Sequence, residues 1–229
     1  MISRLKKVLS TAGLICAASF GSEPATAGVL TFNGFEYGSA TVDIGSIPAP
    51  IITTPSAGAL LTSINGATPF ESFCIDIWQW LGGNDYTFHP SAVGVVTNIG
   101  TINQTTVDNL NRLYNEAHAS IVNDAINSAA FQVAVWEIVY DTPVGLSLSN
   151  GNFFSSGPSA VTGVAAGWLN NLSSYSAGGY VVSAWTSPAQ QDVILFTAVP
   201  EPATYSLVLL ALGLMGFHAR RPHQSRDMK

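Results

Sequence analysis

Residues 105–142, TTVDNLNRLYNEAHASIVNDAINSAAFQVAVWEIVYDT, decide the fold class of this chain. In the first half of the stretch, apolar side chains recur at three- and four-residue spacings, at Val107, Leu110, Tyr114, Ala117 and Ile121. This spacing predicts an amphipathic helix with one face toward a core. Thr105 or Thr106 is expected to cap its N-terminus.

The second half of the stretch predicts another helix. We expect it to begin near Asn123, with Asp124 in its first turn, and to end before Pro143, because proline cannot continue a helix. A third helix is expected over residues 159–172, where one side carries Val161, Val164, Ala165, Trp168 and Leu172.

Short apolar segments broken by Gly and Pro flank these helices. They predict strands over residues 29–35, 39–44, 59–64 and 71–80 before the helices, and over 180–185 and 192–197 after them. The expected fold class is therefore α+β: antiparallel strands at both ends of one domain, with two or three helices grouped in the middle.

Residues 1–27 have the parts of a secretory signal peptide. A positive segment with Arg4, Lys6 and Lys7 precedes the apolar run 8–20, and Ala25-Thr26-Ala27 matches a cleavage site before Gly28. The apolar run is shorter than the roughly 20 residues that a membrane-spanning helix needs. We therefore expect an exported, secreted chain.

A second processing segment is expected at residues 199–229. The tripeptide Pro200-Glu201-Pro202 precedes the apolar run 205–217, and Arg220-Arg221 follows it. Basic residues after an apolar helix hold that end in the cytoplasm, which places the tripeptide on the outer face of the membrane. The short run, interrupted by glycines, suits transient membrane insertion of a C-terminal transmembrane helix better than a permanent anchor.

This order of parts resembles the PEP-CTERM sorting signal. The resemblance implies an exosortase, an integral-membrane protease, as the partner that recognises and cleaves the tail. It also implies a Gram-negative type bacterium and a body that reaches the cell surface or the extracellular matrix. A single extracellular domain, residues 28–198, is expected between the two processing segments.

The charges of this expected domain are nearly all negative. Residues 28–199 contain 11 of the 14 Asp and Glu residues, but Arg112 is their only Lys or Arg. Phosphate binding needs clustered Lys and Arg, so we expect no nucleic-acid partner. Ser, Thr, Asn and Gly must instead provide most of the polar surface.

Conventional enzyme signatures are missing from the sequence, which lacks H-E-x-x-H, P-loop, G-x-S-x-G and G-x-G-x-x-G motifs. His89 and His118 are the candidate bases of the expected domain, and neither has a second His or a Cys at metal-binding spacing. We therefore expect no metal, no cofactor and no enzymatic turnover. A carboxylate pair of the glycosidase type stays possible in principle, so a secreted hydrolase is the third alternative.

Two short motifs carry the most specific chemistry. Cys74 is the only cysteine outside the leader, so it cannot form an intramolecular disulfide in an oxidising compartment. It lies in Phe73-Cys74-Ile75, within an expected strand. Gln132 lies about 58 residues later in FQVAVWE, residues 131–137, within the second expected helix.

These motifs resemble the two motifs of the thioester domains in bacterial surface adhesins. The resemblance implies that the thiol of Cys74 attacks the side-chain amide carbon of Gln132 and expels ammonia. The resulting thioester would acylate an amine or a hydroxyl of a surface ligand or an exopolysaccharide, and so join two molecules covalently in adhesion.

Two less reactive alternatives remain open. Cys74 is a small hydrophobe of the core in one of them, with Gln132 hydrogen-bonded to a neighbouring loop. The other alternative is a non-covalent structural or carbohydrate-binding component of the matrix, in which exposed Trp78 or Trp136 stacks on sugar rings. Core packing is the commoner fate of such aromatic residues.

Overall fold

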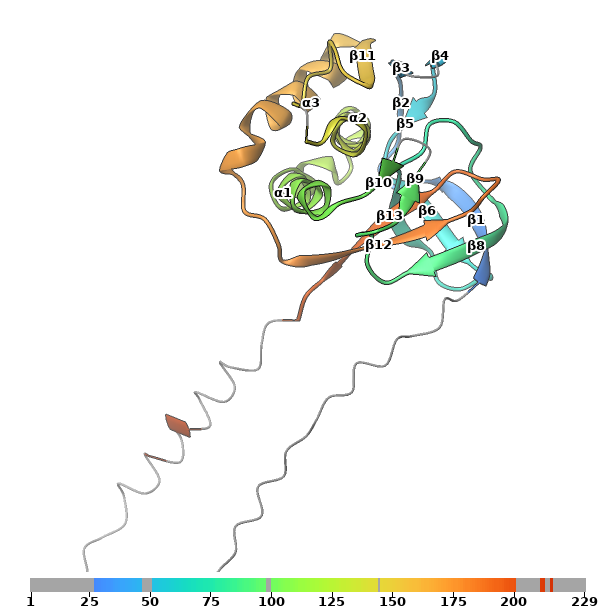
Figure 1. The fold of residues 1–229 in the computed structure, drawn as a ribbon, viewed down its shortest axis with the longest axis vertical. Coiled ribbons are helices and arrows are strands. Elements are labelled where there is room, and N and C mark those ends of the chain that lie inside the picture. The colour runs from blue at the N-terminus through green and yellow to red at the C-terminus, as the bar shows by residue number, and fades with distance from the viewer. Residues whose placement is uncertain are drawn as a thin grey trace, which may run out of the picture.

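The structure is a computed structural model that describes residues 27–46, 51–97, 100–143, 145–200, 211–212 and 215. Its described part consists of a barrel of strands with the helices gathered on one side of it (Figure 1). The helices come from the middle of the chain, and most of the strands flank them in sequence. This arrangement confirms the predicted α+β class.

Antiparallel strands form the closed barrel, and each is hydrogen-bonded to two neighbours. Their order is β1 (Ala27–Phe35), β6 (Leu60–Ile64), β7 (Phe70–Cys74), β13 (Val193–Ala198), β12 (Tyr180–Thr186) and β8 (Gly83–His89). Closure pairs every strand of this sheet and leaves no open edge. Cleavage before Gly28, as the sequence predicts, would remove a single residue from β1.

Three α-helices of the described residues agree with the expected positions. They are α1 (Gln104–Ile121), α2 (Ala125–Asp141) and α3 (Ser159–Asn171), which continues into the short 3₁₀ helix η1 (Leu172–Ser174). The predicted cap of α1 was wrong. Asn103 caps this helix, because its side-chain oxygen accepts the backbone N–H of Thr106 at 3.0 Å. Asp124 caps α2 instead of lying in its first turn.

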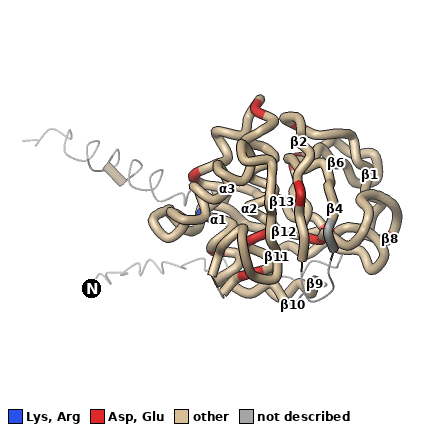
Figure 2. The backbone as a smooth tube through the Cα atoms, turned by 90° about the horizontal axis from the view of Figure 1, so that it is seen from above, with Lys and Arg blue, Asp and Glu red and all other residues tan. Residues whose placement is uncertain are grey.

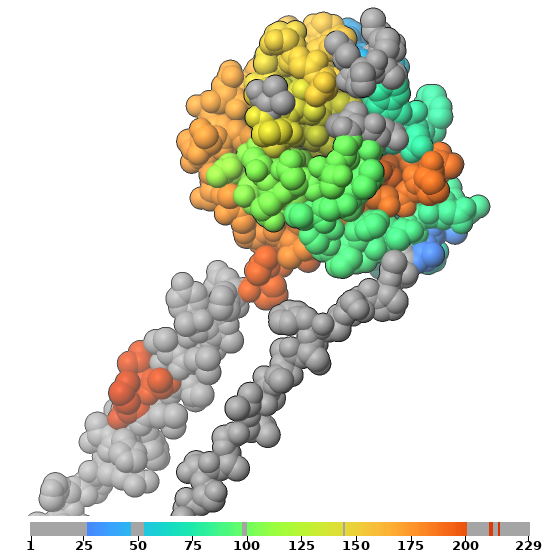
Figure 3. Space-filling view, in the orientation of Figure 1, coloured from blue at the N-terminus to red at the C-terminus, as the bar shows by residue number. Residues whose placement is uncertain are grey.

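Helix α2 is the central element of the helical layer. Every residue from 128 to 141 is buried, and the helix contacts α1, α3, β7 and β11 (Phe153–Gly157). A helix with apolar residues on every side is a core helix, as the Ala- and Val-rich sequence of α2 indicates, and its polar residues Gln132, Glu137 and Asp141 are buried with it. In Figure 3, the helical layer and the barrel adjoin directly in the space-filling view. Any side chain of α2 that points to the barrel is therefore shielded from solvent.

The expected strand over 71–80 was wrong beyond Cys74. Strand β7 ends there, where its pairing with β13 ends at Cys74 and Val193. The carboxylate of Asp76 then accepts the backbone N–H of Trp78 at 2.8 Å. Such a local bond from an Asp side chain turns the chain out of a strand.

Smaller sheets complete the described structure. The expected strand over 39–44 is divided between β2 (Ala40–Thr41), which pairs with β5 (Ser56–Ala57), and β3 (Asp43–Ser46), which lies between β4 (Ile51–Thr53) and β11. The strands β9 (Val96–Thr97) and β10 (Gly100–Thr101) form a separate pair.

Candidate functional site

The structure brings Cys74 and Gln132 together between the barrel and the central helix. Cys74 is the last residue of β7, and Gln132 lies near the middle of α2. The exposed fraction is 5% for Cys74 and 1% for Gln132. Two residues 58 positions apart in sequence therefore meet in a place that bulk water does not reach.

The side-chain amide of Gln132 makes two hydrogen bonds to the main chain of Cys74. The backbone N–H of Cys74 donates to Oε1 of Gln132 at 3.0 Å. Nε2 of Gln132 donates to the carbonyl oxygen of Cys74 at 2.8 Å. Together these bonds fix the plane of the amide and hold its carbon beside Cys74. They also satisfy polar groups that would be costly to bury alone.

Aromatic side chains next to each of the two residues hold the strand and the helix in register. The rings of Phe73 and Phe131 have centroids 4.6 Å apart, and Phe73 also contacts Phe196 of β13 at 6.0 Å. Both Phe73 and Phe131 are fully buried. Packed aromatic pairs resist displacement, so the relative position of Cys74 and Gln132 is set by the core.

The electrostatic surroundings of Cys74 favour a neutral thiol. Burial raises the pKa of the Cys74 thiol far above its usual value, and the nearby charge of Asp76 raises it further. Reactive catalytic cysteines have the opposite environment, with a cation or a helix N-terminus that lowers the pKa. This site therefore contains a buried, neutral thiol beside an amide, and not an ionised, exposed nucleophile.

Two carboxyl groups that the sequence reasoning did not select lie close to Cys74. Asp76 and Asp192 are buried, and the carbonyl oxygen of Asp192 accepts the backbone N–H of Ile75 at 3.0 Å. Burial raises the pKa of Asp192 to about 7, opposed by a hydrogen bond from the backbone of Ser187 and reinforced by Asp76. The run FCIDI, residues 73–77, was a possible signal, since an acidic residue is rarely placed among apolar neighbours without a partner.

The loop after β7 is held rigidly beside this site. Gln191 donates its backbone N–H to the carbonyl oxygen of Trp80 at 2.9 Å, and its side chain donates to the carbonyl oxygen of Asp76. The backbone N–H of Ile77 donates to the hydroxyl of Tyr140 at 3.2 Å. The indole of Trp80, which the sequence reasoning did not single out, is 89% exposed at this loop.

Two further buried carboxylates, Glu137 and Asp141, lie one turn apart on α2. Asp141 accepts the backbone N–H groups of Asn152 and Phe153, and Glu137 accepts that of Ser147. Burial raises the pKa of Glu137 to about 8. These carboxylates hold a loop in place, whereas a hydrolase needs a carboxylate pair that faces its substrate.

The other residues that the sequence singled out lie apart from the Cys74–Gln132 pair. Nε2 of His89 is 2.9 Å from the hydroxyl oxygen of Thr186, and Nε2 of His118 is 3.0 Å from a carboxylate oxygen of Glu71. Within the described ranges, no group of three or more His, Cys, Asp or Glu residues is placed to hold a metal ion. Trp136 is buried against Phe153, so it has no surface for sugar stacking.

Trp78, the other candidate for sugar stacking from the sequence, is half-buried and packs against the core.

Most of the predicted sorting residues fall outside the described part of the chain. Pro200 is described, whereas Glu201, Pro202, Arg220 and Arg221 are not. The expected tail helix over 205–217 also lies outside it, except at positions 211, 212 and 215. None of the helices that the structure does describe combines the length and apolar character required to cross a bilayer.

Comparison with known proteins identifies a sorting motif in the tail of the chain. The PEP-CTERM protein-sorting motif matches residues 198–221, which include all of the predicted sorting residues. The chain therefore carries the sorting motif that exosortase processes, and the motif indicates export to the cell surface or the extracellular space in Gram-negative bacteria. No curated protein matches the chain.

Two solved structures resemble the fold at low sequence identity. One is the N-terminal thioester domain of the fibronectin-binding protein SfbI from Streptococcus pyogenes, with 18% identity and a TM-score of 0.40, covering 63% of this chain and 87% of that chain. The other is the N-terminal domain of the Streptococcus pyogenes pilus tip adhesin Cpa, with 13% identity and a TM-score of 0.40, covering 73% of this chain and 97% of that chain.

Proposed function

We propose that this exported surface protein is a covalent adhesin, in which Cys74 and Gln132 form an internal thioester that acylates a partner. The observation that carries the proposal is the pair of hydrogen bonds between the Gln132 amide and the main chain of Cys74. It supports the proposal because it positions the amide carbon next to the residue that bears the thiol. The domain would act once per molecule, as a binding module and not as a turnover enzyme.

Formation of the thioester exchanges one bond for another. The sulfur of Cys74 bonds to the amide carbon of Gln132, and the bond from that carbon to Nε2 breaks. Nε2 leaves as ammonia and takes the thiol proton with it, so no oxidant or metal is required. The backbone N–H of Cys74, which already donates to Oε1 at 3.0 Å, is placed to stabilise the negative charge that develops on this oxygen.

Transfer to a partner reverses the role of the sulfur. An amine or a hydroxyl of a surface ligand attacks the same carbonyl carbon, the carbon–sulfur bond breaks, and the proton of the nucleophile goes to the sulfur. The product is an amide or ester that joins Gln132 to the partner and frees the thiol. Burial of both residues supports this sequence of events, because a shielded thioester survives hydrolysis until a partner reaches it.

The experiment that tests the proposal is the intact mass of the processed domain, residues 28–199, under native conditions. The wild-type protein should be lighter than its sequence by the mass of one ammonia. Cys74→Ala and Gln132→Glu should each abolish the deficit, and Gln104→Glu, on the exposed start of α1, should retain it. A wild-type mass equal to that of the sequence, with a thiol that titrates only after unfolding, would leave Cys74 as an inert core residue.

A non-covalent, carbohydrate-binding matrix component is the second candidate, and Trp80 favours it. Its 89% exposed indole stands on a loop fixed by hydrogen bonds, and exposed aromatic rings stack on sugars. In this candidate Trp80 takes the role that the sequence assigned to Trp78 or Trp136. Pull-down on insoluble polysaccharide should then be lost in Trp80→Ala and retained in Trp78→Ala, and equal retention of both variants would rule out stacking by Trp80.

A further inference from the structure

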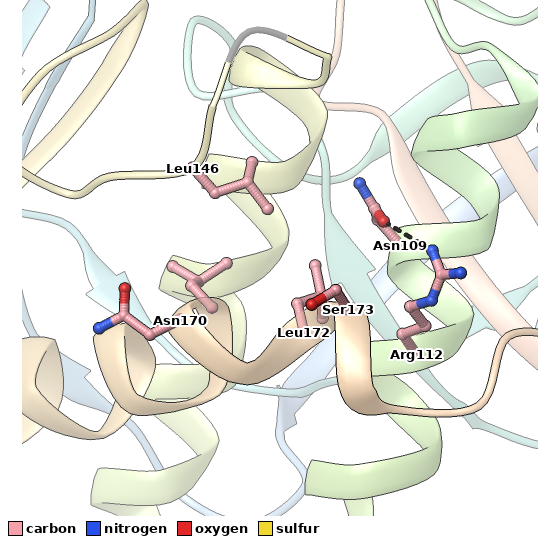
Figure 4. A pocket seen from close by; sticks show the side chains of 7 residues that line it. Asn109, Arg112, Leu146, Asn170, Leu172 and Ser173 are labelled. Atoms are coloured by element: carbon pink, nitrogen blue, oxygen red, sulfur yellow. Dashed lines mark hydrogen bonds between the residues drawn. The ribbon is translucent and has the colours of Figure 1, made fainter.

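An open pocket of about 400 Å³ lies on the helical layer, away from β7 and Cys74. It is bounded by α1, by the loop after α2, and by the C-terminal end of α3 with η1 (Figure 4). The pocket is lined by Asn109, Arg112, Leu146, Leu169, Asn170, Leu172 and Ser173. A volume of this size accommodates a small ligand such as one sugar ring.

The guanidinium group of Arg112 is oriented on the wall of this pocket. Its Nε donates to the carbonyl oxygen of Tyr175 at 3.3 Å, and Nη1 donates to Oδ1 of Asn109 at 3.2 Å. Asn109 is itself held, because its Nδ2 donates to the hydroxyl of Thr142 at 3.3 Å. A guanidinium group has five N–H donors, so three donors of Arg112 remain for a ligand or for water.

No carboxylate among the described residues pairs with this cation. Among the described residues, the contact within ion-pair distance joins His118 and Glu71, and Arg112 is the sole Lys or Arg of residues 28–199. Arg112 lies on α1, and Figure 2 shows acidic residues scattered over the backbone of the described structure. In this part of the chain Arg112 thus has no carboxylate within ion-pair distance, and the nearest acidic residues along α1 are Asp108 and Glu116, one turn away on either side.

Anchoring of the linker after η1 does not explain the charge of Arg112. Asn115, one turn further along α1, holds the same linker with a neutral side chain. Its Nδ2 donates to the carbonyl oxygens of Ser176 at 2.9 Å and Gly178 at 2.6 Å. A neutral amide is sufficient for this tether, so the positive charge at Arg112 is available for another interaction.

The other residues that line the pocket indicate what kind of molecule would carry an anionic group to Arg112. Asn170 and Ser173 are exposed, and in the described structure their side chains have no hydrogen-bond partner, which leaves an amide and a hydroxyl for ligand hydroxyl groups. Leu146, Leu169 and Leu172 provide an apolar wall for C–H groups. We propose that this pocket binds a sugar that bears a carboxylate, a uronate, with its carboxylate on Arg112.

The test is a titration of the isotopically labelled full-length chain, in detergent, with sodium D-glucuronate. Binding is measured by the chemical shifts of the backbone amides in NMR spectra. Glucuronate should shift the amides of Arg112, Asn170, Leu172 and Ser173 in a saturable way. D-glucose, which lacks the carboxylate, should bind at least about tenfold more weakly than glucuronate. A charge-assisted hydrogen-bonded pair contributes on the order of a tenfold change in affinity.

Two variants separate charge from structure. Arg112→Gln keeps an amide donor but removes the charge, and should weaken glucuronate binding about tenfold or more. Asn115→Ala loses a tether of the same linker without touching the pocket, and should bind glucuronate as the wild-type chain does. Unchanged binding in Arg112→Gln, no shifts at the pocket, or equal shifts with glucose would overturn the proposal. So would tighter binding of N-acetylglutamate, which would assign the pocket to peptide carboxylates.

Discussion

Phe73 and Phe131 pack with ring centroids 4.6 Å apart, and each is the residue directly before one member of the Cys74–Gln132 pair. The two rings therefore set the position of β7 against α2, and with it the position of the thiol-bearing residue against the amide. The packing of the core and the geometry of the site are one structural feature in this protein.

The first prediction concerns this aromatic contact. Phe131→Ala should destabilise the domain by about 3–5 kcal/mol, because it removes a fully buried ring from the core. It should also slow or prevent the loss of ammonia, because Gln132 is no longer held in register. Urea unfolding and intact mass measure the two effects, and Phe32→Ala, at a 40% exposed ring of β1, is the matched control. A full ammonia deficit in folded Phe131→Ala would show that the hydrogen bonds alone suffice.

The second prediction concerns reaction with a small amine. Methylamine added to the native wild-type domain should add one methylamine to Gln132 and release one thiol, which iodoacetamide then modifies at Cys74. Before this treatment, the native domain should show no titratable thiol. Cys74→Ala should gain no methylamine. Labelling of the wild-type thiol by iodoacetamide without prior amine would mean that Cys74 is free, and the covalent mechanism would have to be abandoned.

The sequence was sufficient to predict the elements that follow a strong periodicity. The helices α1 and α3 lie where apolar spacing placed them, because spacing of this kind directly reflects one buried face. Helix α2 is buried on all sides, and its position was predicted from its expected start near Asn123 and its stop before Pro143. The closed barrel could not be predicted, since β8 has the polar sequence GNDYTFH and its pairing with β1 and β12 depends on residues far away in the chain. Strand pairing is a tertiary property that local propensity does not specify.

The candidate site could likewise be predicted only in part from the sequence. A lone cysteine and a glutamine in short motifs were visible in the sequence, but the two hydrogen bonds that join Cys74 to Gln132 are visible only in the fold. The burial of Asp76 and Asp192 was likewise hidden, because it results from the meeting of the loops after β7 and β12. Trp136 was undecided between core and surface until α2 was seen to be buried on all sides.

The third prediction concerns the start of the central helix. Asp124 accepts the backbone N–H groups of Ile126 and Asn127, both at 2.9 Å, and these groups have no partner inside α2. Asp124→Ala should lower the free energy of unfolding by about 1 kcal/mol, within a range of roughly 0.5–2 kcal/mol, as for other lost caps. Glu36→Ala, at an exposed position of similar charge, should change it by less than about 0.5 kcal/mol. Chemical denaturation compares the three proteins, and equal stabilities would remove the assigned role of Asp124.

The fourth prediction is that the domain is more stable in mild acid than at slightly alkaline pH. Burial raises the pKa of Glu137 from 4.5 to about 8 and that of Asp192 from 3.8 to about 7. Between its ordinary and its raised pKa, each group keeps its proton in the folded chain and loses it in the unfolded chain, so protons favour folding. Their stabilisation is complete below about pH 4 and is lost as the pH rises through 7 to 8, with a slope of up to about 1.4 kcal/mol per pH unit for each group.

Thermal unfolding across this range should therefore show a melting temperature that falls as the pH increases. Glu137→Gln and Asp192→Asn, which stay neutral at every pH, should each flatten the profile. A melting temperature that rises with pH would mean that both carboxyls are ionised in the folded chain and are stabilised by the backbone N–H groups of Ser147 and Ser187.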